Sequence, residues 1–237
     1  MRDSQHGGQG DRGSDGLTVL ARTVVARLVA RDGVPVKPVD DAMVASIARA
    51  LVTPGITQFE GMRQDLRRAR ITEIDLVDTY FPAVARYLGC AWVDDTAPFT
   101  DVTIGVARMQ AILRQVGRDW TSNAAPDPAG GSVLVVIPEG EQHSFGAVLM
   151  AGQLRRQGIS VRLEIGTPAR TLRRTVHEAS FDCAMISIAC EEKLDPCREV
   201  VSALKDGADG RLRAAAGGAL LERPLDVRGR TGADIAT

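Results

Sequence analysis

The spacing of apolar positions changes once along the chain. Over residues 17–120 apolar residues recur every three to four positions, as at Leu20, Val24 and Leu28, which is typical of amphipathic helices. From residue 132 onward, short apolar runs typical of buried strands alternate with helical runs. This change predicts a helical part followed by an α/β part over residues 132–237.

The helical part is expected to form a small antiparallel bundle of five helices. Proline and glycine mark several of the predicted ends, and Thr72 with Asp75 is typical of a capped helix start. The predicted helices run over Leu17–Ala30, from Asp40 or Asp41 to Leu51, through Phe59, Met62 and Leu66, from Thr72 to Leu88 before Gly89, and from Thr100 or Asp101 to Val116.

The α/β part predicts βαβ units and a doubly wound, Rossmann-like parallel sheet. The expected strands are Val133–Ile137, Ser160–Glu164, Cys183–Ile188 and Arg213–Ala216, and the expected helices are Phe145–Gln157, Leu172–Glu178 and Pro196–Lys205. Residues 232–237 resemble the start of a further helix. Residues 1–16, rich in glycine, are expected to be a disordered tail, and residues 121–131 a linker of turn residues.

Composition narrows the class of protein. The net charge of −1 does not favour strong direct binding to nucleic acid, and the dense arginines are expected to be solvated helix faces. No apolar run reaches the length of a membrane span, so a cytoplasmic protein without a membrane anchor is expected. The cysteines at 90, 183, 190 and 197 are expected to be reduced structural thiols, although Cys190 and Cys197 flank a loop and leave a metal site or a disulfide open.

The most informative segment is the loop between the first strand and its helix, which contains Glu141, His143 and Gly146. A histidine beyond a strand end, with a carboxylate two residues earlier, is a candidate metal ligand with its supporting partner. Two other strand ends carry small or polar residues, Ser187-Ile188-Ala189 and Gly217-Gly218. No GxGxxG motif follows a predicted strand and no GxxxxGK[ST] motif is present, which disfavours dinucleotides and P-loop nucleotides.

Taken together, Glu141-x-His143-x-x-Gly146, then Ser187, then Gly217-Gly218, resemble the cobalamin-binding domain, whose pattern is Asp-x-His-x-x-Gly, Ser-x-Leu and Gly-Gly. The resemblance implies His143 as the axial cobalt ligand and Glu141 as its hydrogen-bonding partner. Gly146 would let the helix start close to the corrin. The other residues that the resemblance places at the cofactor are Gln142, Ser144 and Phe145 around the histidine, and Ser187, Ile188, Ala189, Gly217 and Gly218 along the slot for the nucleotide tail. Glu141 in place of Asp and Ala189 in place of Leu depart from the pattern.

A helical bundle often precedes such domains and covers the upper corrin face. Trp92 and Val102 would then border the cofactor; the alternative for Trp92 is an ordinary bundle core residue. In adenosylcobalamin photoreceptors a Glu-His pair follows the tryptophan after nine residues, where this chain has Val102-Thr103. The segment Gly140-Glu141-Gln142-His143, with Asp-Val-Thr-Ile-Gly at 101–105, looks most like the antirepressors of the AerR/PpaA type.

That resemblance implies a light-responsive regulator that binds hydroxocobalamin or adenosylcobalamin, acts on a repressor of the CrtJ/PpsR type that controls photosystem genes, and is not an enzyme. The alternative is a corrinoid carrier subunit of a methyltransferase system. Carriers resemble Asp-x-His-x-x-Gly-Lys-Asn, whereas Ala147 and Val148 follow Gly146 here, which favours the regulator. An α/β binding module without cobalamin, with His143 as a simple loop histidine, is the third hypothesis.

Overall fold

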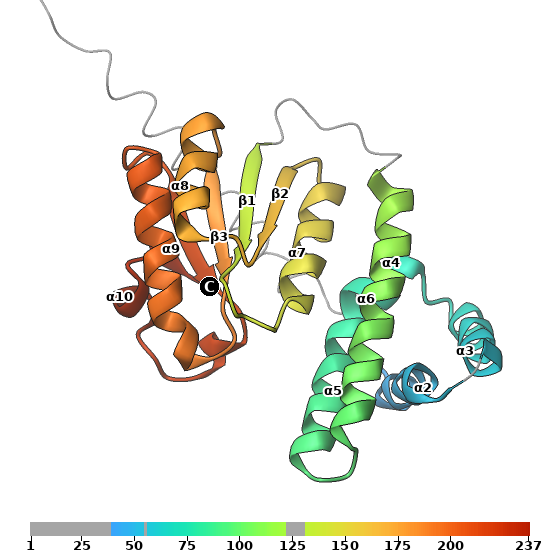
Figure 1. Ribbon diagram of the computed structural model, residues 1–237. Coiled ribbons are helices and arrows are strands. Elements are labelled where there is room, and N and C mark those ends of the chain that lie inside the picture. The colour runs from blue at the N-terminus through green and yellow to red at the C-terminus, as the bar shows by residue number, and fades with distance from the viewer. Residues whose placement is uncertain (1–38, 55, 122–130) are drawn as a thin grey trace, which may run out of the picture. The chain divides into compact units, whose positions relative to one another are not determined.

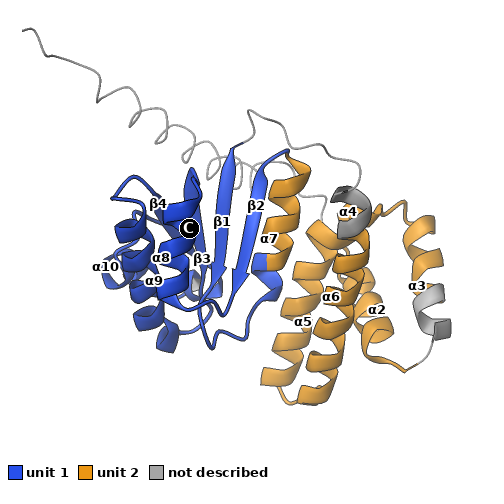
Figure 2. Ribbon diagram, turned by 45° about the horizontal axis from the view of Figure 1, so that its top comes forward, with its two compact units in different colours: residues 1–33, 126–147, 158–237 blue, residues 34–125, 148–157 orange. Residues whose placement is uncertain are grey.

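The computed structural model describes residues 39–54, 56–121 and 131–237. The expected disordered tail, the expected first helix and most of the expected linker lie outside these residues. The chain divides into two compact units (Figure 2). In described residues, one contains 131–147 and 158–237, and the other contains 39–121 apart from 55, together with 148–157.

The first unit is built on a parallel sheet, so the predicted fold class is confirmed. Its five strands lie in the order β2-β1-β3-β4-β5, and every neighbouring pair is parallel. The strands are β1 Ser132–Ile137, β2 Ser160–Ile165, β3 Cys183–Ser187, β4 Arg213–Gly217 and β5 Ile235–Ala236. Residues 133–137 of β1 are all buried, as expected for a strand in the interior of a parallel sheet.

Helices and short 3-10 turns connect the strands. The helices are α7 Phe145–Arg156, α8 Ala169–Glu178, α9 Leu194–Gly207 and α10 Val227–Thr231, and the 3-10 turns are η3 Glu191–Lys193 and η4 Ala219–Glu222. Helices α8 and α9 lie side by side (Figure 1). A Cβ at Gly207 would lie 2.3 Å from the backbone oxygen of Arg173, so this close approach requires glycine.

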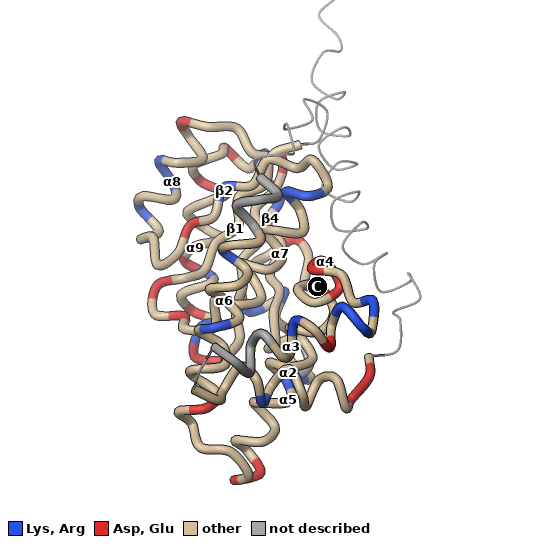
Figure 3. The backbone as a smooth tube through the Cα atoms, turned by 90° about the vertical axis from the view of Figure 1, so that its right-hand side faces the viewer, with Lys and Arg blue, Asp and Glu red and all other residues tan. Residues whose placement is uncertain are grey.

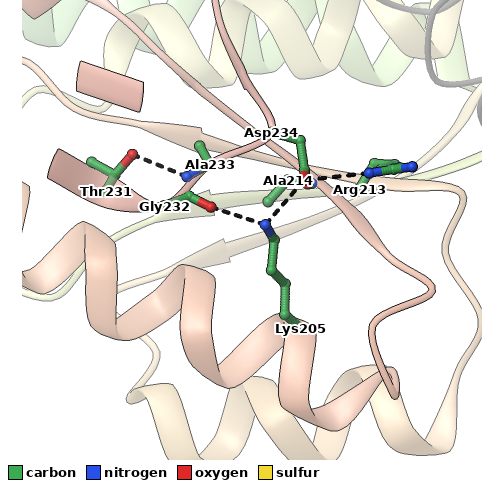
Figure 4. A network of polar contacts seen from close by, with 7 residues as sticks. All are labelled: Lys205, Arg213, Ala214, Thr231, Gly232, Ala233 and Asp234. Atoms are coloured by element: carbon green, nitrogen blue, oxygen red, sulfur yellow. Dashed lines mark hydrogen bonds and ion pairs between the residues drawn. The ribbon is translucent and has the colours of Figure 1, made fainter. Parts of the chain in front are cut away.

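The predicted helix at the end of the chain is wrong. Helix α10 ends at Gly232, whose φ of 72° is the left-handed conformation of a helix C-cap. The chain then forms β5. Asp234, the residue directly before β5, is held by a polar network (Figure 4). The Asp234 carboxylate accepts hydrogen bonds from the Ala214 backbone N–H at 2.8 Å and from Lys205 Nζ at 3.0 Å. These contacts fix the segment as an edge strand.

The second unit contains the predicted helical bundle. Its helices are α2 Asp41–Val52, α3 Ile56–Arg68, α4 Glu73–Asp75, α5 Phe81–Val93 and α6 Phe99–Thr121, and a π-helical segment, η2 Leu76–Tyr80, joins α4 to α5. Asp40 caps α2, and Thr72 with Asp75 forms the predicted capping box. The predicted end at Gly89 is wrong, because this glycine is helical and α5 continues to Val93.

Charged residues of both signs are distributed over the described residues (Figure 3). The last turn of α3 is basic, with Arg67 and Arg68, but Asp65 forms an ion pair with Arg68 at 3.3 Å. The described arginines on α3 and α8 are exposed, as predicted for solvated helix faces. The same prediction is wrong for Arg155 and Arg156 on α7, which are half-buried, and Arg156 forms an ion pair with Asp78. Within the described residues, no helix has the length and apolar character that crossing a membrane requires.

Candidate functional site

The candidate site lies where the direction of the sheet connections reverses. The strand that follows β1 in the chain, β2, lies on one side of it, and β3 lies on its other side. In open α/β sheets of this order, ligands bind beyond the carboxyl ends of the strands at this reversal. The loop after β1 contains Glu141 and His143, and the loop after β3 contains Ile188 to Cys190.

A single buried carboxylate connects these two loops. Glu141 Oε1 accepts a hydrogen bond from the backbone N–H of His143 at 2.8 Å and lies 2.7 Å from Nδ1 of the same residue. Glu141 Oε2 accepts from the backbone N–H of Ala189 at 3.0 Å. The side chain of Glu141 is fully buried. The predicted pairing of Glu141 with His143 is therefore present, and the glutamate also reaches the loop after β3.

These bonds leave the opposite edge of the His143 ring available. The carboxylate favours the tautomer with hydrogen on Nδ1, which leaves the lone pair of Nε2 as an acceptor. No described residue forms a hydrogen bond with Nε2, and the side chain is 67% exposed. This is the arrangement expected of a metal-binding histidine; that His143 binds cobalt stays a prediction.

The electrostatics keep Glu141 ionised. Burial alone would raise the pKa of its carboxyl group, but the N–H groups of His143 and Ala189 and the adjacent imidazole outweigh burial and lower the pKa. An ionised carboxylate is the stronger acceptor for Nδ1–H, and it raises the basicity of the other ring nitrogen.

Two glycines near His143 have different reasons to be glycine. Gly140 has a φ of 73° and lies in a turn, a conformation that side chains rarely adopt. Gly146 is helical and exposed, and a Cβ there would meet nothing within 4 Å. Since no described atom excludes a side chain at Gly146, the space beside it suits a group that approaches the start of α7 from outside. Whether a cofactor occupies the space beside Gly146 stays a prediction.

The predicted residues of the tail slot lie together at the ends of β3 and β4. Ser187 is the register partner of Gly217, and the Ile188 N–H donates to the Gly217 carbonyl at 2.8 Å. Backbone atoms account for both glycines. A Cβ on Gly217 would lie 2.3 Å from the oxygen of Thr237, and one on Gly218, whose φ is 125°, would lie 2.3 Å from the oxygen of Ile188. Contact of these residues with a cofactor tail stays a prediction.

The remaining predicted residues have varied surroundings. Gln142 is exposed, Ser144, Phe145 and Ala189 are half-buried, and the side chain of Ile188 is fully buried. In the bundle unit Trp92 is 47% exposed and its ring centroid lies 5.5 Å from that of Phe99. Trp92 is therefore not a core residue, and Val102 is half-buried on α6. That either borders a cofactor stays a prediction.

The structure adds two residues to the site: Cys190, for which the sequence left metal binding open, and Lys193, which the sequence interpretation missed. Cys190 Sγ lies 3.9 Å from Glu141 Oε2, and burial followed by the nearby Glu141 raises the pKa of its thiol. The Lys193 ammonium lies beside Gly140, because a Cβ on that glycine would be 3.0 Å from Nζ. All four cysteines are free, as predicted, and Cys183 and Cys197 are buried with the pKa of each raised to about 12 by burial. The sequence signal for Cys190 was its position with Cys197 beside a loop, and it gave no indication of the contact with Glu141.

Solved structures share this fold. A monomethylamine corrinoid protein from Methanosarcina barkeri superposes with a TM-score of 0.65 and 11% sequence identity, covering 83% of this chain and 90% of that chain. A cobalamin-binding protein from Desulfitobacterium hafniense has a TM-score of 0.41 and 18% identity, covering 84% of this chain and 92% of that one. The superposition on the monomethylamine corrinoid protein shows that the chain has the same Rossmann-like fold.

A comparison of sequences defines the family. No protein-family model matches the chain. An uncharacterized 20.5 kDa protein in the bchF-crtJ intergenic region of Rhodobacter capsulatus is 34% identical over 173 residues, which are 73% of this chain and 90% of that protein. Identity at this level over most of both chains indicates common descent and a shared fold. The chain belongs to the family of this Rhodobacter capsulatus protein.

Proposed function

We propose that the protein binds cobalamin through His143 and acts as a light-responsive antirepressor on a DNA-binding repressor of the CrtJ/PpsR type. The observation that carries this proposal is the His143 ring, held through Nδ1 by the buried Glu141 while Nε2 is exposed. The position at the reversal of the sheet and the open space at Gly146 support it. So does the shared fold with the monomethylamine corrinoid protein.

The regulatory role rests on a different support. The related Rhodobacter capsulatus protein is encoded in the bchF-crtJ intergenic region, next to a gene whose name is that of the proposed repressor class. The net charge of −1, with residues of both signs distributed along the described backbone (Figure 3), fits a regulator that acts through a protein rather than by binding DNA itself. We propose accordingly that the protein is not an enzyme.

The residues of the site have distinct tasks in this proposal. Glu141 orients the imidazole and favours the proton on Nδ1, so that Nε2 would be available to bind the cobalt of a corrinoid. Its third hydrogen bond, from Ala189, holds the loop after β3 at a constant distance from His143. When bound, cobalamin would supply a cobalt centre with an upper ligand that exchanges or responds to light. A conformation of the protein favoured in one ligand state is then available for a partner to recognise.

The direct test is retention of a corrinoid. The purified chain is incubated with hydroxocobalamin, desalted, and examined by visible absorption spectroscopy. We expect one equivalent to be retained, and His143→Ala to lose it or to show the spectrum of a cobalamin without a protein ligand. His177→Ala is the matched control, because His177 is an exposed histidine on α8. No retained corrinoid band in the wild type, or an unchanged spectrum in His143→Ala, contradicts the proposed site.

The corrinoid carrier of a methyltransferase system is the second candidate, and the likeness to the monomethylamine corrinoid protein favours it. Two assays of the cobalamin-loaded protein separate the candidates. Altered occupancy of promoter DNA by a CrtJ/PpsR-type repressor, without turnover, supports the regulator. Methyl transfer from the loaded cofactor to a thiol acceptor supports the carrier and contradicts the assignment as a non-enzyme.

A further inference from the structure

The candidate cobalt ligand, His143, also belongs to a group of three side chains that could bind a metal ion. Among the described residues, Glu141, His143 and Cys190 each offer a ligand atom, and these atoms lie within 4.8 Å of one another. They come from two loops, because Cys190 follows β3 whereas the other two follow β1. We propose that in the corrinoid-free protein these three residues bind a divalent transition-metal ion, with zinc as the best match.

The chemistry of the donors favours zinc. Nitrogen, oxygen and sulfur ligands from His, Glu and Cys form a set typical of Zn²⁺, which accepts four donors in a tetrahedron. Three protein ligands leave the fourth position to water. Glu141 is buried, but His143 is exposed and Cys190 is half-buried, so the ligand set lies near the protein surface. The thiolate excludes harder ions such as Mg²⁺ and Ca²⁺, which prefer oxygen ligands alone.

The distances need little adjustment. Donors around tetrahedral zinc lie about 3.5 Å apart. Glu141 Oε2 and Cys190 Sγ are 3.9 Å apart, and the Glu141 Oε1 to His143 Nδ1 distance of 2.7 Å would have to lengthen by less than 1 Å. Glu141 also has capacity left, because a carboxylate offers about four acceptor positions. Two N–H groups and the imidazole use three of them.

Such an ion would use the histidine differently from cobalt. Zinc would bind Nδ1, which faces Glu141, with the ring hydrogen transferred to Nε2, and the Cys190 thiol would release its proton to water. The proposed cobalt ligand is instead Nε2 on the other edge. Zinc would also draw Cys190 and Glu141 together and hold the loop after β1 against the loop after β3. We infer that zinc slows the uptake of corrinoid; this second part rests on the proposed function.

Metal binding is tested without any corrinoid. Aqueous Co²⁺ is titrated into the reduced wild type as a visible probe, and Zn²⁺ is used to displace it. We expect one equivalent per chain, with a thiolate-to-metal charge-transfer band that Cys190→Ser abolishes. His143→Ala should lower zinc affinity on the order of 100-fold, at least as much as loss of an outer partner. Cys90→Ser is the matched control, because Cys90 is an exposed free thiol on α5, and it should keep the band.

The competition experiment is separate. Hydroxocobalamin uptake is measured with and without one equivalent of Zn²⁺. We expect zinc to slow uptake by the wild type and a chelator to restore the rate. Zinc should not slow uptake by Cys190→Ser. Substoichiometric metal in the wild type, or a Cys190→Ser variant that retains the band, overturns the metal site whatever the corrinoid result. If the metal binds and no corrinoid is retained, the site stands and the proposed function fails. If the uptake rates with and without zinc are equal, the inference that zinc slows corrinoid uptake is wrong, but the proposed metal site is not affected.

Discussion

At the scale of single residues, Gly146 is a position where a substitution should affect ligand binding without disturbing the fold. A Cβ at this helical position meets no described atom, so Gly146→Ala should leave the corrinoid-free protein folded. Replacing glycine in a helix should even raise the free energy of unfolding by about 0.5–1 kcal/mol. If the cofactor lies against the start of α7, the added methyl group should weaken hydroxocobalamin binding at the same time.

Both effects are measurable on one sample, by urea unfolding of the corrinoid-free protein and by titration with hydroxocobalamin. Gly152→Ala is a suitable control, since its added Cβ lies 3.5 Å from the nearest atom of Arg156 on the same helix. Unchanged corrinoid affinity in Gly146→Ala would show that no cofactor lies close to this glycine.

The site also shows how far residue-level inference from the sequence extends. The pairing of Glu141 with His143 was predictable, because two residues of one short loop are held close by the chain itself. The contact between Glu141 and the loop of Ala189 and Cys190 depends on β1 and β3 being neighbours in the sheet. Residues 48 positions apart meet only through this order. The alternation of strands and helices predicts a parallel sheet but leaves the order of its strands open.

At the scale of elements, long strands were predicted correctly from the sequence, whereas the shortest strand was not. The four longer strands are confirmed, because five or six residues between turns are enough for an apolar run or an apolar–polar alternation to be recognised. Strand β5 has two residues, too few for any periodicity, and depends on Asp234 and its partners instead. Gly89 is a further example. A glycine ends a helix only where the backbone turns left-handed, and no sequence pattern near residue 89 reports that it stays helical.

The Asp234 network that precedes β5 predicts a pH dependence (Figure 4). Burial would raise the pKa of this carboxyl group, but the Ala214 N–H, Lys205 and Arg213 outweigh burial and lower it below 3.8. As the pH falls, Asp234 is therefore protonated in the unfolded chain before it is protonated in the folded protein. The stabilisation that the ionised Asp234 provides is complete above the ordinary pKa of aspartate, and it is lost as the pH falls through the lower pKa of the folded protein. Asp234→Asn should reduce the free energy of unfolding by about 2 kcal/mol at neutral pH.

As the pH falls from about 5 to about 3, the free energy of unfolding of Asp234→Asn should decrease less than that of the wild type. Urea unfolding across this range provides the measurement. Asp209→Asn is the control, because the side chain of Asp209 is 75% exposed in its ion pair with Arg211 and should change stability little. Equal acid sensitivity of Asp234→Asn and the wild type would contradict the role given to the network.

A largely buried ion pair joins Asp78 and Arg156 within the bundle unit. Asp78 lies in the π-helical segment η2, Arg156 is the last residue of α7, and the two side chains are 6% and 14% exposed. Removal of one member leaves the other charge without this partner in a buried position, so Asp78→Ala should lower the free energy of unfolding by about 3–5 kcal/mol.

The exposed pair of Arg174 and Glu178 on α8 is the matched comparison, since its side chains are 72% and 66% exposed. Glu178→Ala should cost no more than about 0.5 kcal/mol. Chemical denaturation of both variants and of an Asp78→Ala/Arg156→Met double variant tests the difference. The double variant should recover part of the loss, because it removes both charges together. Similar losses for the two single variants would argue against a stabilising role for burial of the Asp78 pair.

At the scale of the whole molecule, α7 is the element that both units share. It begins two residues after His143, and its residues 148–156 group with the bundle, as Figure 2 shows. Its last residue carries the ion pair to Asp78. A rigid helix transmits a restraint at one end to the other, because its backbone hydrogen bonds open cooperatively. Ordering at His143 is therefore expected to extend beyond the sheet unit.

Hydrogen exchange measures this directly. Binding of hydroxocobalamin should slow amide exchange in the loops that contain His143 and Ala189, and also along α7 as far as Arg156. Asp78→Asn should keep the slowing in the two loops and lose it at the end of α7, because the amide cannot replace the ionic partner of Arg156. His143→Ala under the same conditions defines exchange without the proposed cobalt ligand. Slowing confined to the two loops in the wild type would mean that α7 does not carry the state of the site into the bundle, and a partner that recognises that state would then have to contact the sheet unit itself.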